Sequence, residues 1–191
     1  MIKIFYDLET TGLNYRVNGI HHISGIVDRD DEVVERFDFK VRPPEKAKIE
    51  AAALRVGGVT EAEIMAYPEM SIVYNQFRAV LKKYIDPADR SNKAYLCGYN
   101  NAAFDDFFLQ KFFELNKDAF FAAYFFGSLD VIVLARQYLR YRVPKMPSFK
   151  LKRVALEVGL EVDETRLHDA AYDVELTRQI YRIVTGVDLE I

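Results

Sequence analysis

The chain has 191 residues, of which 50% are hydrophobic and 29% charged, and a formal net charge of −3. This length and composition predict a single folded domain over residues 1–191 and exclude a disordered chain. The slightly acidic balance argues against tight, non-specific binding of duplex DNA through a large basic surface. The lone Cys97 excludes an internal disulfide and a cysteine-based zinc site. Without a secretory signal or a membrane-spanning apolar run, we expect a cytoplasmic protein with no membrane partner.

Strands and short helices are predicted for the first half of the chain. Apolar runs rich in β-forming residues indicate three strands, over residues 2–8, 20–28 and 32–42. A charged turn over residues 28–31 joins the second strand to the third as a hairpin. The spacing of Thr60 and Glu63 fits a capping box that begins a short helix. A short helix is also expected over residues 46–54, and a longer one over residues 71–85.

The second half is predicted to be mainly helical. Residues 94–98 form a short apolar run typical of a buried strand, and residues 129–131 predict a last short strand. Helices are expected over residues 103–115, 131–140, 149–158 and 169–185. Strands come first, and helices then alternate with strands before they accumulate. This order predicts an α/β fold with helices on both faces of a sheet.

Asp7 and Glu9 are the most informative residues of the first predicted strand. Residues two apart on a strand face the same side of the sheet, so both carboxylates are expected to project together from its end. Gly12 then breaks the strand pattern. Paired carboxylates repel each other unless a cation or a proton neutralises them. The pair therefore suggests a divalent metal site.

Two further polar clusters lie where strands end and helices begin. Asn100, Asn101 and Asp105 follow the short fourth strand, and functional groups gather beyond strand ends in open α/β sheets. His168 and Asp173 are five residues apart, which corresponds to a rotation of about 140° on a helix. We therefore expect His168 in the preceding loop, where it can act as a general base, and Asp173 one turn into the helix. Taken singly, each of these two clusters is better explained by an ordinary helix start.

Together, the three clusters resemble the DEDD superfamily of 3′–5′ exonucleases, also called DnaQ-like, in its DEDDh branch. The first motif of that family, an aromatic residue followed by Asp-x-Glu-Thr-Thr-Gly, matches residues 6–12. The second, Asn-x-x-Phe-Asp, matches residues 101–105, and the third, His-x-Ala-x-x-Asp, matches residues 168–173. The resemblance runs from about residue 2 to 185. One departure is Asn100, where the family often has His.

The resemblance implies a ribonuclease H-like mixed β-sheet flanked by helices on both faces, and a site for two metals. It implies that two divalent cations, Mg²⁺ or Mn²⁺, are held by Asp7, Glu9, Asp105 and Asp173. His168 would be the general base that takes a proton from the attacking water. Contacts to the substrate are implied for Thr10, Thr11, Gly12, Leu13, Asn100, Asn101 and Phe104.

The implied activity is removal of nucleoside 5′-monophosphates from single-stranded 3′ ends of nucleic acid. DNA is favoured, in proofreading or repair, and an RNA-trimming enzyme of the same family is the alternative, because discrimination of the 2′-OH depends on a few contacts. A catalytically silent nucleic-acid-binding module ranks lower, because all four acids and the histidine are present. A polymerase partner stays open, although standalone action is favoured because few residues follow the last helix.

Several polar residues fall outside this expected site. His21 and His22 lie within the second strand, where at most one of them can face the side of the first motif. Asp106 and Asp169 adjoin motif acids and are expected to be surface or capping groups. Asp130 is left open between a structural role and a supporting role in the site.

Overall fold

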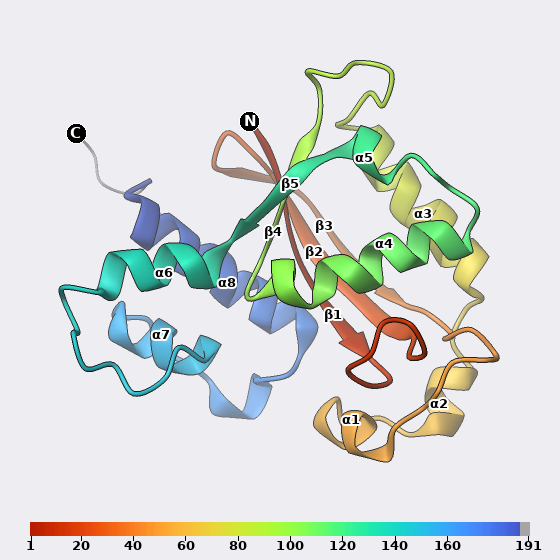
Figure 1. Ribbon diagram of the computed structural model, residues 1–191, viewed down its shortest axis with the longest axis horizontal. Coiled ribbons are helices and arrows are strands. Elements are labelled where there is room, and N and C mark those ends of the chain that lie inside the picture. Colours follow the sequence, from red (N-terminus) through yellow and green to blue (C-terminus); the bar gives the residue numbers. More distant parts are fainter. Residues whose placement is uncertain (188–191) are drawn as a thin grey trace.

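The computed structural model describes residues 1–187, which form a mixed five-stranded sheet with helices on both faces (Figure 1). The strands are β1 (Ile2–Thr10), β2 (Ile20–Arg29), β3 (Glu32–Lys40), β4 (Ala94–Gly98) and β5 (Phe125–Asp130). Their order in the sheet is β3-β2-β1-β4-β5. β2 is antiparallel to both β1 and β3, whereas β4 is parallel to β1 and β5. The α/β architecture predicted from the sequence is confirmed.

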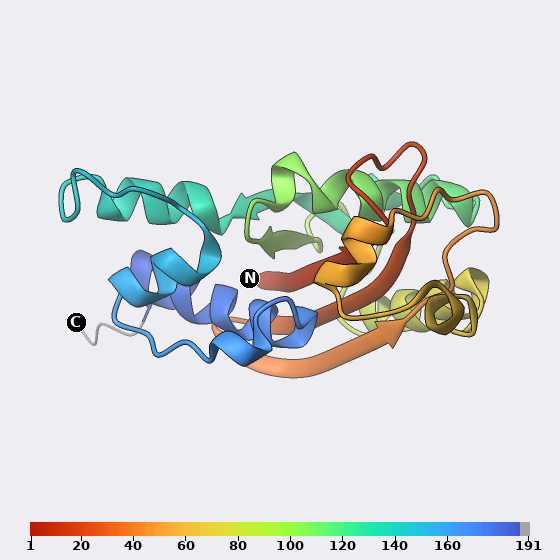
Figure 2. The same ribbon diagram turned by 90° about the horizontal axis from the view of Figure 1, so that it is seen from below.

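Helices cover both faces of this sheet (Figures 1 and 2). On one face lie α3 (Met70–Lys82) and α4 (Asp105–Leu115). On the other lie α6 (Val131–Leu139), α7 (Leu151–Glu157) and α8 (Ala170–Thr185). The short helices α1 (Ala51–Val56) and α2 (Glu61–Met65) lie beyond the C-terminal end of β1, and α5 (Phe121–Tyr124) leads into β5. Two single turns of 3₁₀ helix, η1 (Asn101–Ala103) and η2 (Glu164–Arg166), precede α4 and α8. None of the helices within residues 1–187 is long and apolar enough to cross a membrane.

The alternation of side chains along β1 decides which face carries its acids. Ile4 and Leu8 are buried against α3 and α4, whereas Phe5 packs with residues of α6, α7 and α8. Because successive side chains of a strand point to opposite faces, Asp7 and Glu9 share the face of Phe5. The apolar pattern of the strand thus places both carboxylates on the side that α8 covers.

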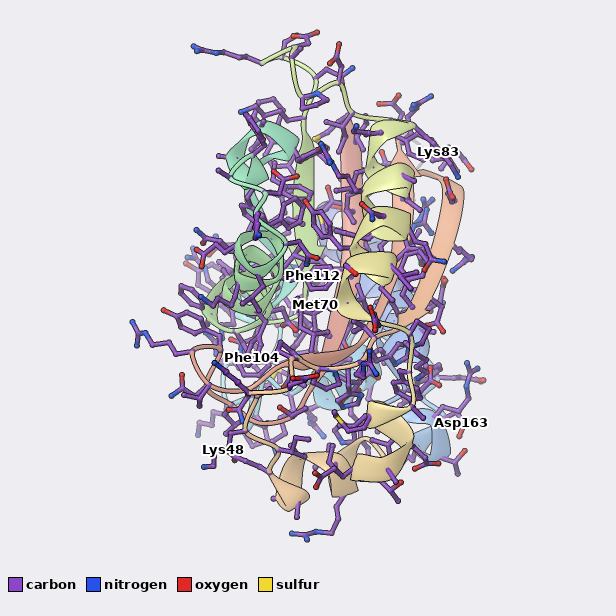
Figure 3. The ribbon with its side chains drawn as sticks, turned by 90° about the vertical axis from the view of Figure 1, so that its right-hand side faces the viewer. Lys48, Met70, Lys83, Phe104, Phe112 and Asp163 are labelled. Carbon is purple, nitrogen blue, oxygen red and sulfur yellow. The ribbon has the colours of Figure 1, made fainter. Side chains whose placement is uncertain are left out.

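Aromatic packing between α3 and α4 fixes the position of α4. The ring of Tyr74 on α3 lies edge-on to Phe112 and Phe113 on α4, with centroid distances of 5.4 and 5.2 Å. Figure 3 shows Phe112 and Met70 where the two helices run side by side. Edge-to-face ring pairs of this kind add to the free energy of burial. Since α4 begins at Asp105, this core also positions the acid of the second motif.

The predicted helix over residues 46–54 begins only at Ala51. The backbone N–H of Glu50 donates to the carbonyl of Thr11 at 2.8 Å, and that of Lys48 donates to Val17 at 2.7 Å. The segment before Ala51 therefore pairs with the loop after β1 instead of forming helical hydrogen bonds. The capping box predicted for Thr60 and Glu63 is confirmed at the start of α2.

The last strand, predicted over residues 129–131, extends further toward the N-terminus and begins at Phe125. It pairs in parallel with β4 from Ala94 opposite Phe125 to Gly98 opposite Asp130. As the edge strand it exposes three consecutive residues, including Phe126, and so lacks the alternating burial that marks a strand in a sequence.

A network of buried ion pairs joins β1, β2 and α8. The Nζ atom of Lys3 lies 3.2 Å from Oδ1 of Asp28, and Nε of Arg178 donates to Oδ2 of the same carboxylate at 2.9 Å. Asp31 accepts a further hydrogen bond from Lys3. Burial lowers the pKa of Lys3, but the carboxylates of Asp31 and Asp28 outweigh it and the net shift is upward. The positive charges of Lys3 and Arg178 are thus neutralised by carboxylates inside the protein.

Candidate active site

Four acids from three separate segments lie close enough, near the C-terminal end of β1, for their charges to act on one another. Burial raises the pKa of Asp7 well above its usual range, and the charges of Asp105, Glu9 and Asp173 raise it further. Asp7 and Glu9 belong to β1, whereas Asp105 belongs to α4 and Asp173 to α8. The fold therefore brings together the acids of all three motifs.

The other three acids also retain their protons more strongly than ordinary carboxylic acids. Burial, followed by the charge of Asp173, raises the pKa of Glu9 to about 7, although Lys40 opposes the shift. Burial raises the pKa of Asp105 to about 8 and that of Asp173 to about 6. Perturbed carboxylates gathered in one place are typical of functional sites.

Asp105 is positioned as the first residue of α4, where only 6% of its surface is exposed. Hydrogen bonds from its own backbone N–H and from that of Leu8 favour the ionised carboxylate, but they do not offset the effect of burial on its pKa. The N-terminus of a helix is a favourable place for a negative charge. Asp105 is thus held rigidly against the strand that carries the first two acids.

His168 and Asp173 have the arrangement expected from their spacing. Asp169 caps α8 by accepting a hydrogen bond from the N–H of Tyr172 at 2.9 Å, as predicted for a capping group. His168 therefore lies in the loop before the helix, with a positive φ of 69°, and its side chain is exposed. Its backbone N–H donates to Oδ2 of Asp173 at 3.3 Å, which ties the loop to the acid.

The donor chemistry of the four acids fits a divalent cation. They offer only hard oxygen ligands, and Oδ1 of Asp173 is buried without a hydrogen-bond partner among the described residues. Within residues 1–187, however, no three His, Cys, Asp or Glu side chains are arranged to hold a metal ion as they stand. The fit of these acids to a cation therefore rests on the chemistry of their oxygen atoms and on their mutual repulsion.

Glu9 and His168 line one cavity of about 310 Å³, which also has two histidines in its wall. Both His21 and His22 border it, contrary to the expectation that at most one of them faces the first motif. The pairing of β1 with β2 shifts register here: Glu9 lies opposite His22, and Thr10 opposite Ile20. His21 is thus the extra residue of a β-bulge, which disturbs the strict alternation of the strand.

The same cavity includes residues that the sequence did not indicate. The loop 56–59 after α1 and the exposed Lys40 at the end of β3 form part of its wall. A Cβ on Gly57 would lie 3.6 Å from Cε1 of His21 and 3.7 Å from Oε2 of Glu9. Nothing in the sequence placed Gly57 and Gly58 beside β1.

Asp130 and Asp106 hold the second motif in place from either side. Asp130 accepts hydrogen bonds from the backbone N–H groups of Asn100 and Ala102, at 2.9 and 3.2 Å, while it also caps α6. It has a structural role. Asp106 accepts hydrogen bonds from Tyr6, Asn101 and Ser128. The expectation of a surface or capping role for Asp106 is wrong, because its partners come from three separate segments.

The second-motif residues expected to contact substrate differ in accessibility. Asn100 is exposed and adopts the left-handed conformation, with φ of 66°, which Asn tolerates better than most residues. Asn101 is fully buried and packs tightly against Gly98. A Cβ at position 98 would lie only 2.7 Å from the Cβ of Asn101, so position 98 requires a glycine. Phe104, half-buried, packs its ring 5.0 Å from that of Phe108.

The loop after Glu9 is stabilised by its own hydroxyl groups. Thr10 donates to the carbonyl of Gly12 at 2.8 Å, and Thr11 donates to that of Lys48 at 2.7 Å. The side chain of Thr11 is completely buried, whereas Leu13 is 81% exposed. Thr10 and Thr11 thus shape the loop, and Leu13 is the side chain that it presents to the surface.

Solved structures share this fold. The structure of E. coli Exonuclease I in complex with a dT13 oligonucleotide matches with a TM-score of 0.79, covering 96% of this chain and 41% of that chain. Its apo form matches with a TM-score of 0.77 over 97% of this chain and 42% of that chain. Sequence identity is 22% in both cases, so the likeness defines the fold, a ribonuclease H-like exonuclease fold.

The sequence defines the family more closely. Residues 4–181 match the RNase_T family, described as Exonuclease, and the chain belongs to this family. It is 25% identical over 178 residues to the DNA polymerase III PolC-type of Mycoplasmopsis pulmonis, covering 93% of this chain and 11% of that protein. It is 27% identical over 190 residues to Ribonuclease T of Shewanella sp. (strain W3-18-1), covering 93% of this chain and 78% of that protein.

Proposed function

We propose that this chain is a metal-dependent 3′–5′ exonuclease that releases nucleoside 5′-monophosphates from single-stranded 3′ ends. The observation that carries the proposal is the meeting of Asp7, Glu9, Asp105 and Asp173, whose charges act on one another beyond the end of β1. Membership of the exonuclease family supports the same conclusion. Exonuclease I, which shares the fold, has been solved with a single-stranded oligonucleotide.

The four acids would hold two divalent cations, Mg²⁺ or Mn²⁺. The unpartnered Oδ1 of Asp173 and the raised pKa values of the acids indicate that this cluster needs additional positive charge. When bound, two such cations would neutralise the acids and stabilise the negative charge that develops on a phosphodiester during in-line displacement.

His168 is the proposed general base. It lies in an exposed loop, is tied to Asp173 through its backbone, and lines the cavity that Glu9 also borders. It takes a proton from water, whose oxygen attacks the phosphorus of the terminal phosphodiester. The bond to the 3′-oxygen of the preceding nucleotide breaks, and this oxygen takes up a proton. The products are a nucleoside 5′-monophosphate and a strand with a new 3′-OH end.

The terminal nucleotide is proposed to lie against the loop after Glu9 and the turn of the second motif. Leu13, Asn100 and Phe104 are the accessible side chains among the expected contacts. DNA remains the favoured polymer, and RNA trimming remains the alternative, which the similarity to Ribonuclease T supports. The similarity to the PolC-type polymerase keeps a polymerase partner open.

The test uses end-labelled single-stranded DNA and RNA of matched sequence, with and without Mg²⁺. We expect stepwise shortening from the 3′ end that requires the metal and prefers one polymer. Asp7→Asn is the matched control, because it removes one charge without changing the size of the side chain. Binding of either strand without metal-dependent cleavage would instead support the catalytically silent module.

A further inference from the structure

His21 is a buried histidine without a hydrogen-bond partner. Only 2% of the surface of His21 is exposed, and neither nitrogen of its ring has a hydrogen-bond partner among the described residues. The adjacent His22 differs: its Nε2 lies 2.6 Å from Oδ1 of Asp38, and its Nδ1 lies 3.0 Å from Nζ of Lys40. Buried polar groups almost always have partners, so the two free nitrogens of His21 require an explanation.

The position of the His21 ring suggests what its partner is. The β-bulge at the start of β2 places this ring in the wall of the cavity that Glu9 and His168 also line. Cε1 of His21 and Oε2 of Glu9 each lie within 4 Å of the point that a Cβ on Gly57 would occupy. Because Gly57 has no side chain, the loop passes close to both groups without placing a side chain of that residue between them.

We propose that His21 forms a hydrogen bond with a hydroxyl group on the sugar of the 3′-terminal nucleotide. This inference rests on the proposed exonuclease function, in which Glu9 helps to hold the scissile phosphate through a cation. The sugar of the terminal nucleotide is joined to that phosphate through C5′, so it is the first part of the nucleotide that a group beside Glu9 meets. The base lies further away.

The chemistry of the ring matches a hydroxyl group. A neutral imidazole offers one donor and one acceptor, and a hydroxyl group can engage either of them. Burial lowers the pKa of His21 to about 4, with smaller contributions from His22 and Lys40, so the ring is uncharged near neutral pH. A sugar hydroxyl is an uncharged partner, whereas a phosphate would favour a cationic ring.

The experiment compares oligodeoxynucleotides that differ only in the terminal sugar. One ends in an ordinary deoxynucleotide, one in a 2′,3′-dideoxynucleotide and one in a ribonucleotide, and removal of the first nucleotide is followed in single-turnover reactions. For the wild type, loss of the contacted hydroxyl is expected to reduce the rate constant by about 3- to 10-fold, the range for one neutral hydrogen bond. His21→Phe is expected to lose this discrimination, and His21→Gln to retain part of it.

The choice of ends distinguishes the two hydroxyl groups. Discrimination between deoxy and dideoxy ends that depends on His21 identifies the 3′-hydroxyl, and discrimination confined to the ribonucleotide end identifies the 2′-hydroxyl. His22→Phe is the matched control, because it replaces an equally buried histidine that already has partners. Thermal unfolding shows whether each variant is folded.

The two levels of the proposal fail in different ways. If the wild type degrades neither these three strands nor an RNA strand of matched sequence with Mg²⁺, the exonuclease function itself is wrong. If the wild type is active and folded His21→Phe discriminates between the ends as the wild type does, only the role of His21 is overturned.

Discussion

The two ends of β1 carry buried charges that are balanced in opposite ways. At the N-terminal end, Lys3 and Arg178 share the carboxylate of Asp28, so each buried charge faces an opposite charge of the protein itself. At the C-terminal end, Asp7 and Glu9 face further acids, and the pKa of each is raised. One strand thus ends in a neutralised network on one side and in an unbalanced cluster on the other.

This difference separates a structural use of buried charge from a functional one. In a buried pair of opposite charges, mutual attraction opposes the loss of hydration, and no ion from solution is needed to neutralise the pair. A buried cluster of one sign lowers stability until a proton or a cation from solution neutralises it. The cluster of acids is therefore expected to lower the stability of the metal-free fold, as a site that binds metal would.

The largest effect is expected for Asp7→Asn. Asp7 is the acid on which all three other acids act, so its loss removes a central ligand of the proposed cations. We expect metal-dependent cleavage to fall below detection, while the metal-free protein becomes more stable because repulsion is relieved. Exonuclease assays and denaturant unfolding in EDTA measure the two effects. Unchanged activity would contradict the whole assignment of the site.

His168→Ala is expected to reduce turnover by about 10²- to 10⁴-fold, the usual contribution of a general base. Because the side chain of His168 is exposed and lies in a loop, the unfolding midpoint should stay near that of the wild type. Turnover measured against pH at saturating Mg²⁺ checks the role. A variant with wild-type turnover at neutral pH would show that another group takes the proton.

Lys3→Met tests the opposite end of the strand. It leaves the buried Asp28 with Arg178 alone, and breaking a buried charge network in this way costs about 3–5 kcal/mol. Lys83→Met is the matched control, because Lys83 pairs with Glu35 at the surface, with 56% of its side chain exposed, and such pairs contribute about 0–1 kcal/mol. Urea unfolding of both variants provides the comparison. Equal losses would mean that burial does not distinguish the two pairs.

The sequence predicted those parts of the site that depend on local geometry. The period of two in β1 placed Asp7 and Glu9 on one face, and helical rotation placed His168 in the loop before Asp173. The β-bulge at His21 was not predictable, because an extra residue in β2 becomes visible only when β2 is paired with β1. The role of Asp106 was missed for a similar reason.

Predictions of strands and helices also succeeded where local pattern decides the structure and failed where distant segments interact. Strands with alternating or continuous apolar residues were found, the edge strand β3 among them, whereas the first part of β5 was not, because three consecutive exposed residues interrupt its pattern. The start of α1 was placed too early, because Glu50 bonds to Thr11, 39 positions earlier in the chain. Interactions between distant segments decided both cases.

The smallest effect that we predict is a pH dependence of stability confined to the metal-free protein. Folded-state pKa values of about 6 for Asp173, 7 for Glu9 and 8 for Asp105 all lie above the usual value near 4 for unfolded carboxylic acids. The folded state therefore binds more protons than the unfolded state. The stability that this proton binding provides is complete below about pH 4 and is lost as pH rises to about 8.

In EDTA, we expect the free energy of unfolding to fall steadily as the pH rises from 5 to 8. Saturating Mg²⁺ should flatten this slope, because a cation replaces the proton as the neutralising charge. Asp7→Asn should flatten it without metal. Lys3→Met should leave the slope unchanged while lowering the whole curve, since the network at the other end of β1 is already neutralised by the protein. If the metal-free slope has the opposite sign, the acids are balanced within the fold and the contrast between the two ends of the strand is lost.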